Sequence, residues 1–167
     1  MVEVRLGAVR VDLHSQTPVL LLTETVGLGR TLPIFVGPPE ATAIAFAVQG
    51  VVTPRPMTHD LLRDTLDALG VVLERVVITD LRDKTYFAEL HLRSAGEEVT
   101  VSARPSDAVA LAVRTGSPLF VSDELMDDEG IMLPDEDEED QEDESPEEIV
   151  GEFREFLEQV RPEDFSS

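Results

Sequence analysis

The stretch Arg104-Pro105-Ser106-Asp107-Ala108-Val109-Ala110-Leu111-Ala112 decides the fold, because an altered copy of it occurs earlier in the chain. Sixty-seven positions before it the chain reads Gly37-Pro38-Pro39-Glu40-Ala41-Thr42-Ala43-Ile44-Ala45, and both copies share Pro-x-acid-Ala-x-Ala-(Ile/Leu)-Ala. The same offset, without a gap, places Gly29 on Gly96. A period of this length suits a two-fold repeat inside one domain rather than a solenoid. We therefore predict two strand-strand-strand-helix units, over about residues 4–50 and 71–117.

Apolar periodicity defines the elements of each unit. Alternating apolar residues predict strands, with a bulge near Gly7 in the first strand, and the continuous apolar run 19–22 predicts a strand covered on both faces. Proline-led, alanine-rich stretches predict helices over about 39–49 and 106–115, whose small side chains favour close packing. The predicted fold class is α+β: mixed or antiparallel sheets packed by alanine-rich helices.

An extra helix is expected between the two units. Thr58 is a good N-cap and Gly70 a stop signal, and five residues are predicted to form the buried stripe: Leu61, Leu62, Thr65, Leu66 and Leu69. In the second unit, residues 80–83 are predicted to form a turn between two strands.

Composition bounds the class of protein. A chain of 167 residues with 42% hydrophobic residues suits one domain with a real core. No apolar run reaches membrane-spanning length and no signal peptide is evident, so we expect no membrane span. The absence of cysteine fits a cytoplasmic location. Exposed strand edges and a spare apolar helix favour a homo-oligomer, with a dimer expected.

The negative charge is concentrated at the C-terminal end. Residues 1–131 hold 11 basic and 19 acidic residues, a net charge of −8, and residues 132–167 hold 2 and 16, a net charge of −14. Proteins that bind nucleic acid mainly by neutralising phosphates are normally basic. The composition therefore counts against tight, extended binding to DNA.

Three regions follow from this pattern: a domain over 1–131, an acidic linker over 132–145 and a C-terminal segment over 146–167. Nine of the ten residues 135–144 are acidic, which predicts disorder. The segment after Ser145 begins with a capping box and carries one apolar stripe: Ile149, Phe153, Phe156, Leu157 and Val160. Such a short helix is marginal alone, so we expect it to dock on its own domain or on a protein partner.

Arginines precede two of the predicted helices. Arg55 and Arg104 lie just before helix N-termini, where free N–H groups and the helix dipole favour a phosphate. Thr58 and Ser106 would then be phosphate ligands or simply N-caps.

The first turns of the predicted helices carry Glu40, Asp60 and Asp107, which could hold a metal ion, respond to the dipole or pair with the arginines. His59 is a candidate general base or metal ligand.

Familiar catalytic motifs are absent from the sequence, including the phosphate-binding glycine loop, the zinc-protease His-Glu-x-x-His and the nucleophile elbow. With no cysteine, the ligands available to a metal ion are carboxylates and histidine. That set suits Mg²⁺ or Mn²⁺ better than structural zinc.

Three motifs in order resemble the bifunctional nuclease domain family over about residues 2–130. They read Leu32-Pro33-Ile34-Phe35-Val36-Gly37, then Arg55-Pro56-Met57-Thr58-His59-Asp60-Leu61-Leu62, and the stretch 104–112 quoted above. The resemblance implies an α+β domain that cleaves RNA and DNA, as plant members are reported to do. One departure is Ser102, which stands where the family usually has an acid.

From the resemblance we predict a metal-assisted nuclease. His59, Asp60 and Asp107 would be catalytic, and Glu40, Asp60 and Asp107 would position Mg²⁺ or Mn²⁺. Arg55, Thr58, Arg104 and Ser106 would bind the phosphate. Two alternatives stay open: a non-catalytic module that binds an anion or a protein and is inhibited by its own acidic tail, and an adaptor recruited through Phe153 and Phe156.

Overall fold

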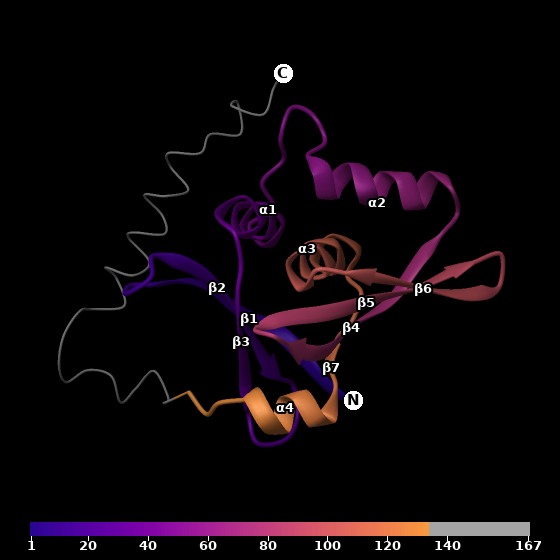
Figure 1. Ribbon diagram of the computed structural model, residues 1–167. Coiled ribbons are helices and arrows are strands. Elements are labelled where there is room, and N and C mark those ends of the chain that lie inside the picture. Colours follow the sequence, from indigo (N-terminus) through magenta and orange to yellow (C-terminus); the bar gives the residue numbers. More distant parts are fainter. Residues whose placement is uncertain (134–167) are drawn as a thin grey trace.

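The computed structural model describes residues 1–133 and shows an α+β arrangement of one seven-stranded mixed sheet and four helices (Figure 1). The predicted α+β class is confirmed. The elements are, in chain order, β1 (Val2–Asp12), β2 (Thr17–Glu24), β3 (Thr31–Phe35), α1 (Pro38–Val48), α2 (Thr58–Ala68), β4 (Val72–Arg82), β5 (Thr85–Ser94), β6 (Glu97–Ala103), α3 (Pro105–Thr115), β7 (Leu119–Val121) and α4 (Asp123–Glu129). The predicted helix within 146–167 and the acidic block before it lie outside the described residues.

The sheet has the strand order β3-β2-β1-β7-β4-β5-β6. Two antiparallel three-stranded groups flank β7, which pairs antiparallel with β1 and parallel with β4. Each group is followed by a proline-led helix, and the offset of 67 residues that relates the two sequence stretches also relates Pro38, the first residue of α1, to Pro105, the first residue of α3. Pro38 and Pro105 therefore each begin a helix that follows a three-stranded group.

Two local predictions for the first unit are confirmed. The register of β1 against β2 shifts between Leu6 and Ala8, which is the bulge expected near Gly7. Residues 18–22 of β2 are all buried, because this strand is covered on both faces.

The predicted turn at residues 80–83 was wrong: β4 runs on to Arg82, and the tight turn is made by Asp83 and Lys84, both with positive φ.

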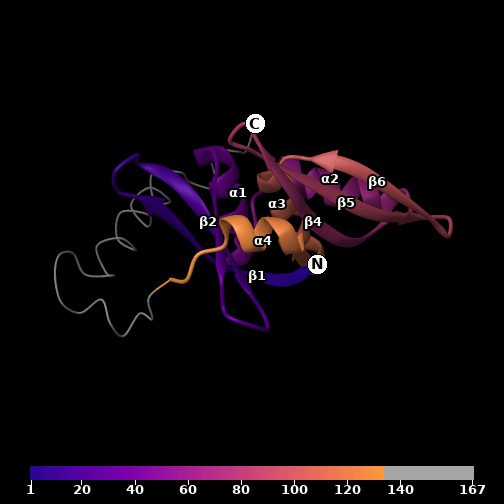
Figure 2. The ribbon, with the colours of Figure 1, turned by 60° about the horizontal axis from the view of Figure 1, so that its bottom comes forward.

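The helices lie on both faces of the sheet. Figures 1 and 2 show α1, α2 and α3 together on one face and α4 on the other. α1 packs against α3, and its alanines Ala41, Ala43 and Ala45 are buried, as expected of an alanine-rich helix in close contact. The core consists of these helix faces and the strand residues beneath them, among them Leu20, Leu22 and Ile78.

The prediction for α2 was partly wrong. The helix forms where expected, but its leucine stripe is not the buried face: Leu61, Leu62 and Leu69 are exposed, and His59 is its one buried residue. α2 packs on α3 rather than on the sheet, and of its four leucines only Leu66 packs, partly buried, against the core. No helix in residues 1–133 is long and apolar enough to cross a membrane.

Candidate functional site

Four of the predicted site residues come together where three helices begin. Glu40 lies in the first turn of α1, His59 is the second residue of α2, Asp107 lies in the first turn of α3, and Arg104 immediately precedes α3. The first turn of a helix leaves backbone N–H groups without intrahelical partners. Acidic side chains and an anion-binding guanidinium are therefore brought to the positive ends of neighbouring helices.

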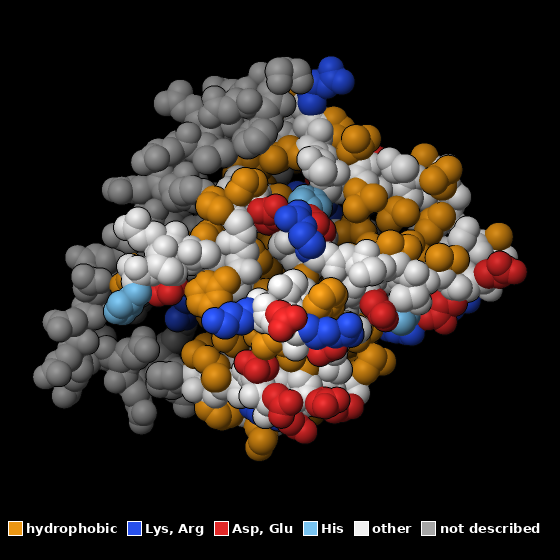
Figure 3. Space-filling view, in the orientation of Figure 1, with side chains coloured by type: hydrophobic (Ala, Val, Ile, Leu, Met, Phe, Trp, Pro, Cys, Tyr) orange, Lys and Arg blue, Asp and Glu red, His pale blue; other side chains and the backbone are white. Residues whose placement is uncertain are grey.

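The four side chains form one continuous chain of contacts. His59 Nε2 lies 2.9 Å from Asp107 Oδ1. Arg104 binds the same carboxylate through two bonds, from Nε to Oδ2 at 2.7 Å and from Nη2 to Oδ1 at 3.1 Å. Arg104 Nη2 also lies 3.0 Å from Glu40 Oε1. Figure 3 shows acidic, basic and histidine side chains meeting near the centre of the face that carries α1 and α3.

The exposure of the side chains increases along this chain of contacts, from His59 to Arg104. The side chain of His59 is 9% exposed, that of Asp107 32% and that of Arg104 65%. The imidazole is thus held in a packed position while the guanidinium faces solvent. A molecule that approaches from solvent meets Arg104 first and His59 behind it.

The carboxyl at the centre is held in its charged form. Burial raises the pKa of Asp107, but the hydrogen bonds from Arg104 and His59 outweigh burial, so its pKa lies below the usual 3.8. Asp107 in turn raises the pKa of Arg104. The carboxylate can accept Nε2–H from a neutral imidazole, which leaves Nδ1 as the nitrogen able to accept a proton.

Asp60 is turned away from this group. Its Oδ1 accepts a hydrogen bond from Arg114 Nε at 2.7 Å, and its Oδ2 accepts the backbone N–H of Met57 at 3.0 Å, which caps α2. Burial raises the pKa of Asp60, but these two bonds outweigh it and the pKa lies below 3.8. Asp60 is therefore paired with Arg114, and not with His59, Asp107, Arg104 or Glu40.

Arg114 was missed by the sequence reasoning. Its side chain is 4% exposed, and besides Asp60 it binds Ala110 O within α3 and Ala43 O of α1, each at 2.9 Å. One guanidinium thus fastens α1, α2 and α3 to each other behind the site. Arg114 stands seven residues after Asp107, two turns along the same helix, and this spacing was the signal by which the sequence could have pointed to it.

The polar residues at the helix starts differ from expectation. Thr58 and Ser106 were predicted as N-caps, but the N-cap residues are Met57 in α2 and Arg104 in α3, and neither of these makes a capping hydrogen bond with its own side chain. Thr58 is the exposed first residue of α2, and Ser106 is buried as the second residue of α3. Arg55 is exposed on the connector before α2, and within residues 1–133 its guanidinium forms no ion pair.

The three predicted metal ligands are not grouped. Within the described residues no three His, Asp or Glu side chains are arranged to hold a metal ion. Glu40 and Asp107 both contact Arg104, whose guanidinium supplies the positive charge between them, and Asp60 contacts Arg114. In this arrangement arginine occupies the place a divalent cation would take, so the residues do not fit the ion as they stand.

Gly37 gives Glu40 its position. The Glu40 carboxylate folds back over Gly37, and a Cβ at residue 37 would collide with Glu40 Oε2. The glycine has an ordinary φ of −71°, so its role here is space rather than backbone freedom.

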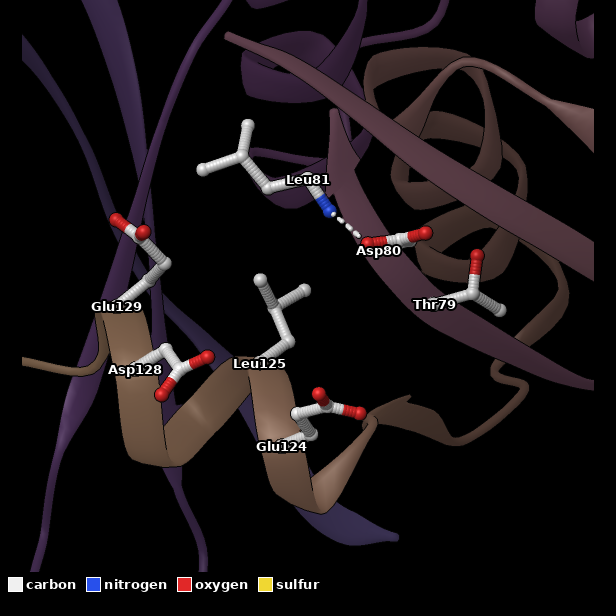
Figure 4. Close-up of a pocket in the computed structure, with 7 residues that line it drawn as sticks. All are labelled: Thr79, Asp80, Leu81, Glu124, Leu125, Asp128 and Glu129. Carbon is white, nitrogen blue, oxygen red and sulfur yellow. Dashed lines mark hydrogen bonds between the residues drawn. The ribbon is translucent and has the colours of Figure 1, made fainter. Parts of the chain in front are cut away.

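A separate cavity lies on the opposite face, between α4 and β4 (Figure 4). It has a volume of about 280 Å³ and is lined by Thr79, Asp80, Leu81, Glu124, Leu125, Asp128 and Glu129. Its four acidic side chains and lack of basic ones make it unfavourable for a phosphate. The predicted site residues and this cavity therefore lie in different places.

The chain is similar to a known family and to individual known proteins. A family model described as the bifunctional nuclease domain matches residues 20–134. An uncharacterized protein of Mycobacterium tuberculosis is 45% identical over 167 residues, which cover 100% of this chain and 99% of that protein.

Two plant proteins are also similar. Bifunctional nuclease 2 of Arabidopsis thaliana is 32% identical over 112 residues, and bifunctional nuclease 1 is 29% identical over 123 residues. These matches cover 65% and 72% of this chain but 34% and 38% of the plant proteins, so the similarity spans little more than a third of their length. On the family match, the chain belongs to the bifunctional nuclease domain family.

Proposed function

We propose that the protein is a nuclease, which hydrolyses phosphodiester bonds of RNA, DNA or both at the His59, Asp107, Arg104 and Glu40 group. Family membership supports a nuclease-like role. The observation that carries the residue assignment is the contact of a buried histidine with a charged carboxylate, 2.9 Å apart, beside an exposed arginine. That combination can bind a phosphate and move a proton at one place.

Each residue has a role in the proposal. Asp107 accepts Nε2–H of His59 and fixes the imidazole, and Nδ1 takes the proton of the attacking water or ribose hydroxyl as its oxygen bonds to phosphorus. The P–O bond to the leaving oxygen breaks, and that oxygen takes a proton from the imidazolium or from water. Arg104 binds the scissile phosphate, helped by the free N–H groups at the start of α3. Glu40 also holds Arg104, through the same Nη2 that contacts Asp107.

The remaining predicted residues have weaker support. Asp60 would act indirectly, by fixing α2 through Met57 and Arg114, and Arg55 and Thr58 would contact phosphates next to the scissile one. A requirement for Mg²⁺ or Mn²⁺ stays a prediction, and no step above is assigned to a metal ion. We also infer that the two strand-helix units arose by duplication and that the protein acts in the cytoplasm.

The test is hydrolysis of end-labelled single-stranded RNA and DNA by the full-length protein. Each substrate is incubated with EDTA, with Mg²⁺ and with Mn²⁺, which separates the metal requirement from the activity. Asp107→Asn should reduce hydrolysis, whereas the matched control Asp64→Asn, on the outer side of α2 with a 45% exposed side chain, should not. A folded Asp107→Asn variant with full activity would reject the assignment.

A second candidate function is a non-catalytic anion-binding module. It is favoured by Ser102, which stands where the resemblance to the family would place an acid, and by the net charge of −8 over residues 1–131. Removal of residues 134–167 tests the predicted inhibition by the acidic tail. A large gain in nucleic-acid affinity without hydrolysis would support this candidate over the nuclease.

A further inference from the structure

An apolar surface remains open between α2 and β6. Its exposed members are Leu61, Leu62 and Leu69 of α2, and Val99 and Val101 of β6. Figure 3 shows hydrophobic side chains gathered in the hollow between these two elements. A contiguous exposed apolar patch on a folded domain usually marks an interaction surface.

The two valines face the helix layer. Val99 pairs with Leu92 and Val101 with Leu90, and both leucines are buried in the core. Paired residues of antiparallel strands point to the same face of a sheet. Val99 and Val101 therefore continue the core surface outward, past the point where α3 covers it, and remain 45% and 42% exposed.

The two edge strands of the sheet differ in their protection against pairing with a further strand. On β3 the edge carries Pro33, which cannot donate to a further strand, and Thr31 is bridged by Ile131. On β6 the seven residues Glu97–Ala103 include no proline, glycine or lysine. A regular edge strand without such residues is a template for pairing with another strand.

β6 can pair with a second copy of itself in a register that uses the whole strand. An antiparallel pair centred on Thr100 aligns all seven residues of the strand. It sets Val99 beside Val101 of the other copy and places Glu98 opposite Ser102 and Glu97 opposite Ala103. No glutamate then faces a glutamate, whereas centring on Glu98 would set that residue against itself.

We propose that two copies of this chain pair antiparallel through β6, centred on Thr100, and cover the α2–β6 surface between them. The two-fold axis of such a pair is perpendicular to the sheet, so both helix layers lie on one face. The valines of both edges join into one apolar strip, and the exposed leucines of both α2 helices close over it. Both His59 groups then open on the same side of the dimer.

Sedimentation equilibrium of the full-length protein and three variants tests the interface. The wild type should have twice the chain mass of 18.4 kDa. Val101→Glu and Leu69→Glu, at exposed positions that a monomer tolerates, should give monomers with unchanged circular dichroism. Val26→Glu, at an 85% exposed apolar residue in the turn between β2 and β3, should stay dimeric. A monomeric wild type, or a Val101→Glu variant as dimeric as the control, overturns the proposal.

The register is tested by cysteine cross-linking, since the chain contains no cysteine. Thr100→Cys lies opposite itself at about 5 Å between Cα atoms, within disulfide reach, and should oxidise to a covalent dimer. Ser102→Cys is the matched control, because its copy lies four residues away along the strand, about 13 Å. Cross-linking of Ser102→Cys but not Thr100→Cys would overturn this pairing.

Discussion

His59 Nε2 and Asp107 Oδ1 lie 2.9 Å apart although 48 residues separate them in the chain, and this contact joins the start of α2 to the start of α3. The same carboxylate is held by Arg104, which in turn reaches Glu40 at the start of α1. Three helix N-termini are thus connected through side chains that can bind phosphate and transfer a proton. The following predictions test what each member of this group does.

Replacement of Arg104 should weaken substrate binding more than folding. Arg104→Lys keeps the charge but loses the two-pronged contact with Asp107, and we expect kcat/KM to fall by about 10-fold or more. Steady-state hydrolysis of a labelled oligonucleotide measures this loss. The control is Arg93→Ala, which removes from β5 a half-exposed arginine that is paired with Glu74 of β4, and it should change kcat/KM little. Equal losses in both variants would mean that Arg104 has no particular role.

Gly37→Ala should displace the Glu40 carboxylate without unfolding the protein. The new Cβ collides with Glu40 Oε2, the flexible end of a side chain, so the carboxylate moves and its contact with Arg104 is lost. Activity should fall while the thermal midpoint changes little. The double variant Gly37→Ala with Glu40→Ala should be no worse than Glu40→Ala alone, since the two changes act on the same contact.

Asp60→Ala should destabilise the fold. It leaves the 4% exposed Arg114 without its carboxylate, and because Asp60 itself is 23% exposed we expect a cost of about 2 to 3 kcal/mol, below the range for a fully buried pair. Urea denaturation followed by circular dichroism measures the free energy of unfolding. Asp64→Asn, on the same helix, should remain within about 0.5 kcal/mol of the wild type.

The Asp60 contribution should also depend on pH in a defined direction. The folded-state pKa of Asp60 is lowered from 3.8, so the folded protein binds fewer protons than the unfolded chain. Its stabilising contribution is therefore present above about pH 3.8 and is lost as the pH falls below that value. The free energy of unfolding of the wild type and of Asp60→Asn should converge on acidification, and parallel curves would contradict this linkage.

The place of the site was predictable because the sequence motifs sit at helix starts. Proline at the first position of α1 and of α3, with an acid two residues later, fixes where Glu40 and Asp107 lie relative to each helix. Close packing of the two alanine-rich helices then brings the two acids toward one point. That His59, Arg104, Glu40 and Asp107 contact each other required the tertiary structure.

Other features were not predictable from local patterns. The leucine stripe of α2 reads as a buried face, but α2 rests on α3, and which face meets α3 depends on the ion pair of Asp60 with Arg114. Thr58 and Ser106 satisfy N-cap preferences, yet α3 begins at Pro105, and α2 begins at Thr58 itself, with Asp60 accepting the N–H of Met57. For the leucine stripe a tertiary contact outweighed the local pattern, whereas at the helix starts one local preference, worth about 1 kcal/mol, gave way to another.

Binding of single-stranded nucleic acid should depend only weakly on salt. Arg104 and Arg55 are the exposed arginines near the start of α2 and α3, and two phosphate contacts give a slope of about −1.4 for log affinity against log salt concentration. Fluorescence anisotropy of an inactive variant over a salt series measures the slope. A slope several times steeper would require a basic surface that residues 1–131, with 11 basic and 19 acidic side chains, do not provide.

The central claim is that His59, fixed by Asp107, transfers the proton during phosphodiester hydrolysis. The most direct measurement is the rate of hydrolysis of single-stranded RNA and DNA by His59→Gln, because glutamine can still donate a hydrogen bond to Asp107 but cannot act as a base at neutral pH. We predict a fall of at least about 100-fold in kcat with circular dichroism and thermal midpoint close to those of the wild type. A folded His59→Gln protein that hydrolyses both substrates at the wild-type rate would contradict the account.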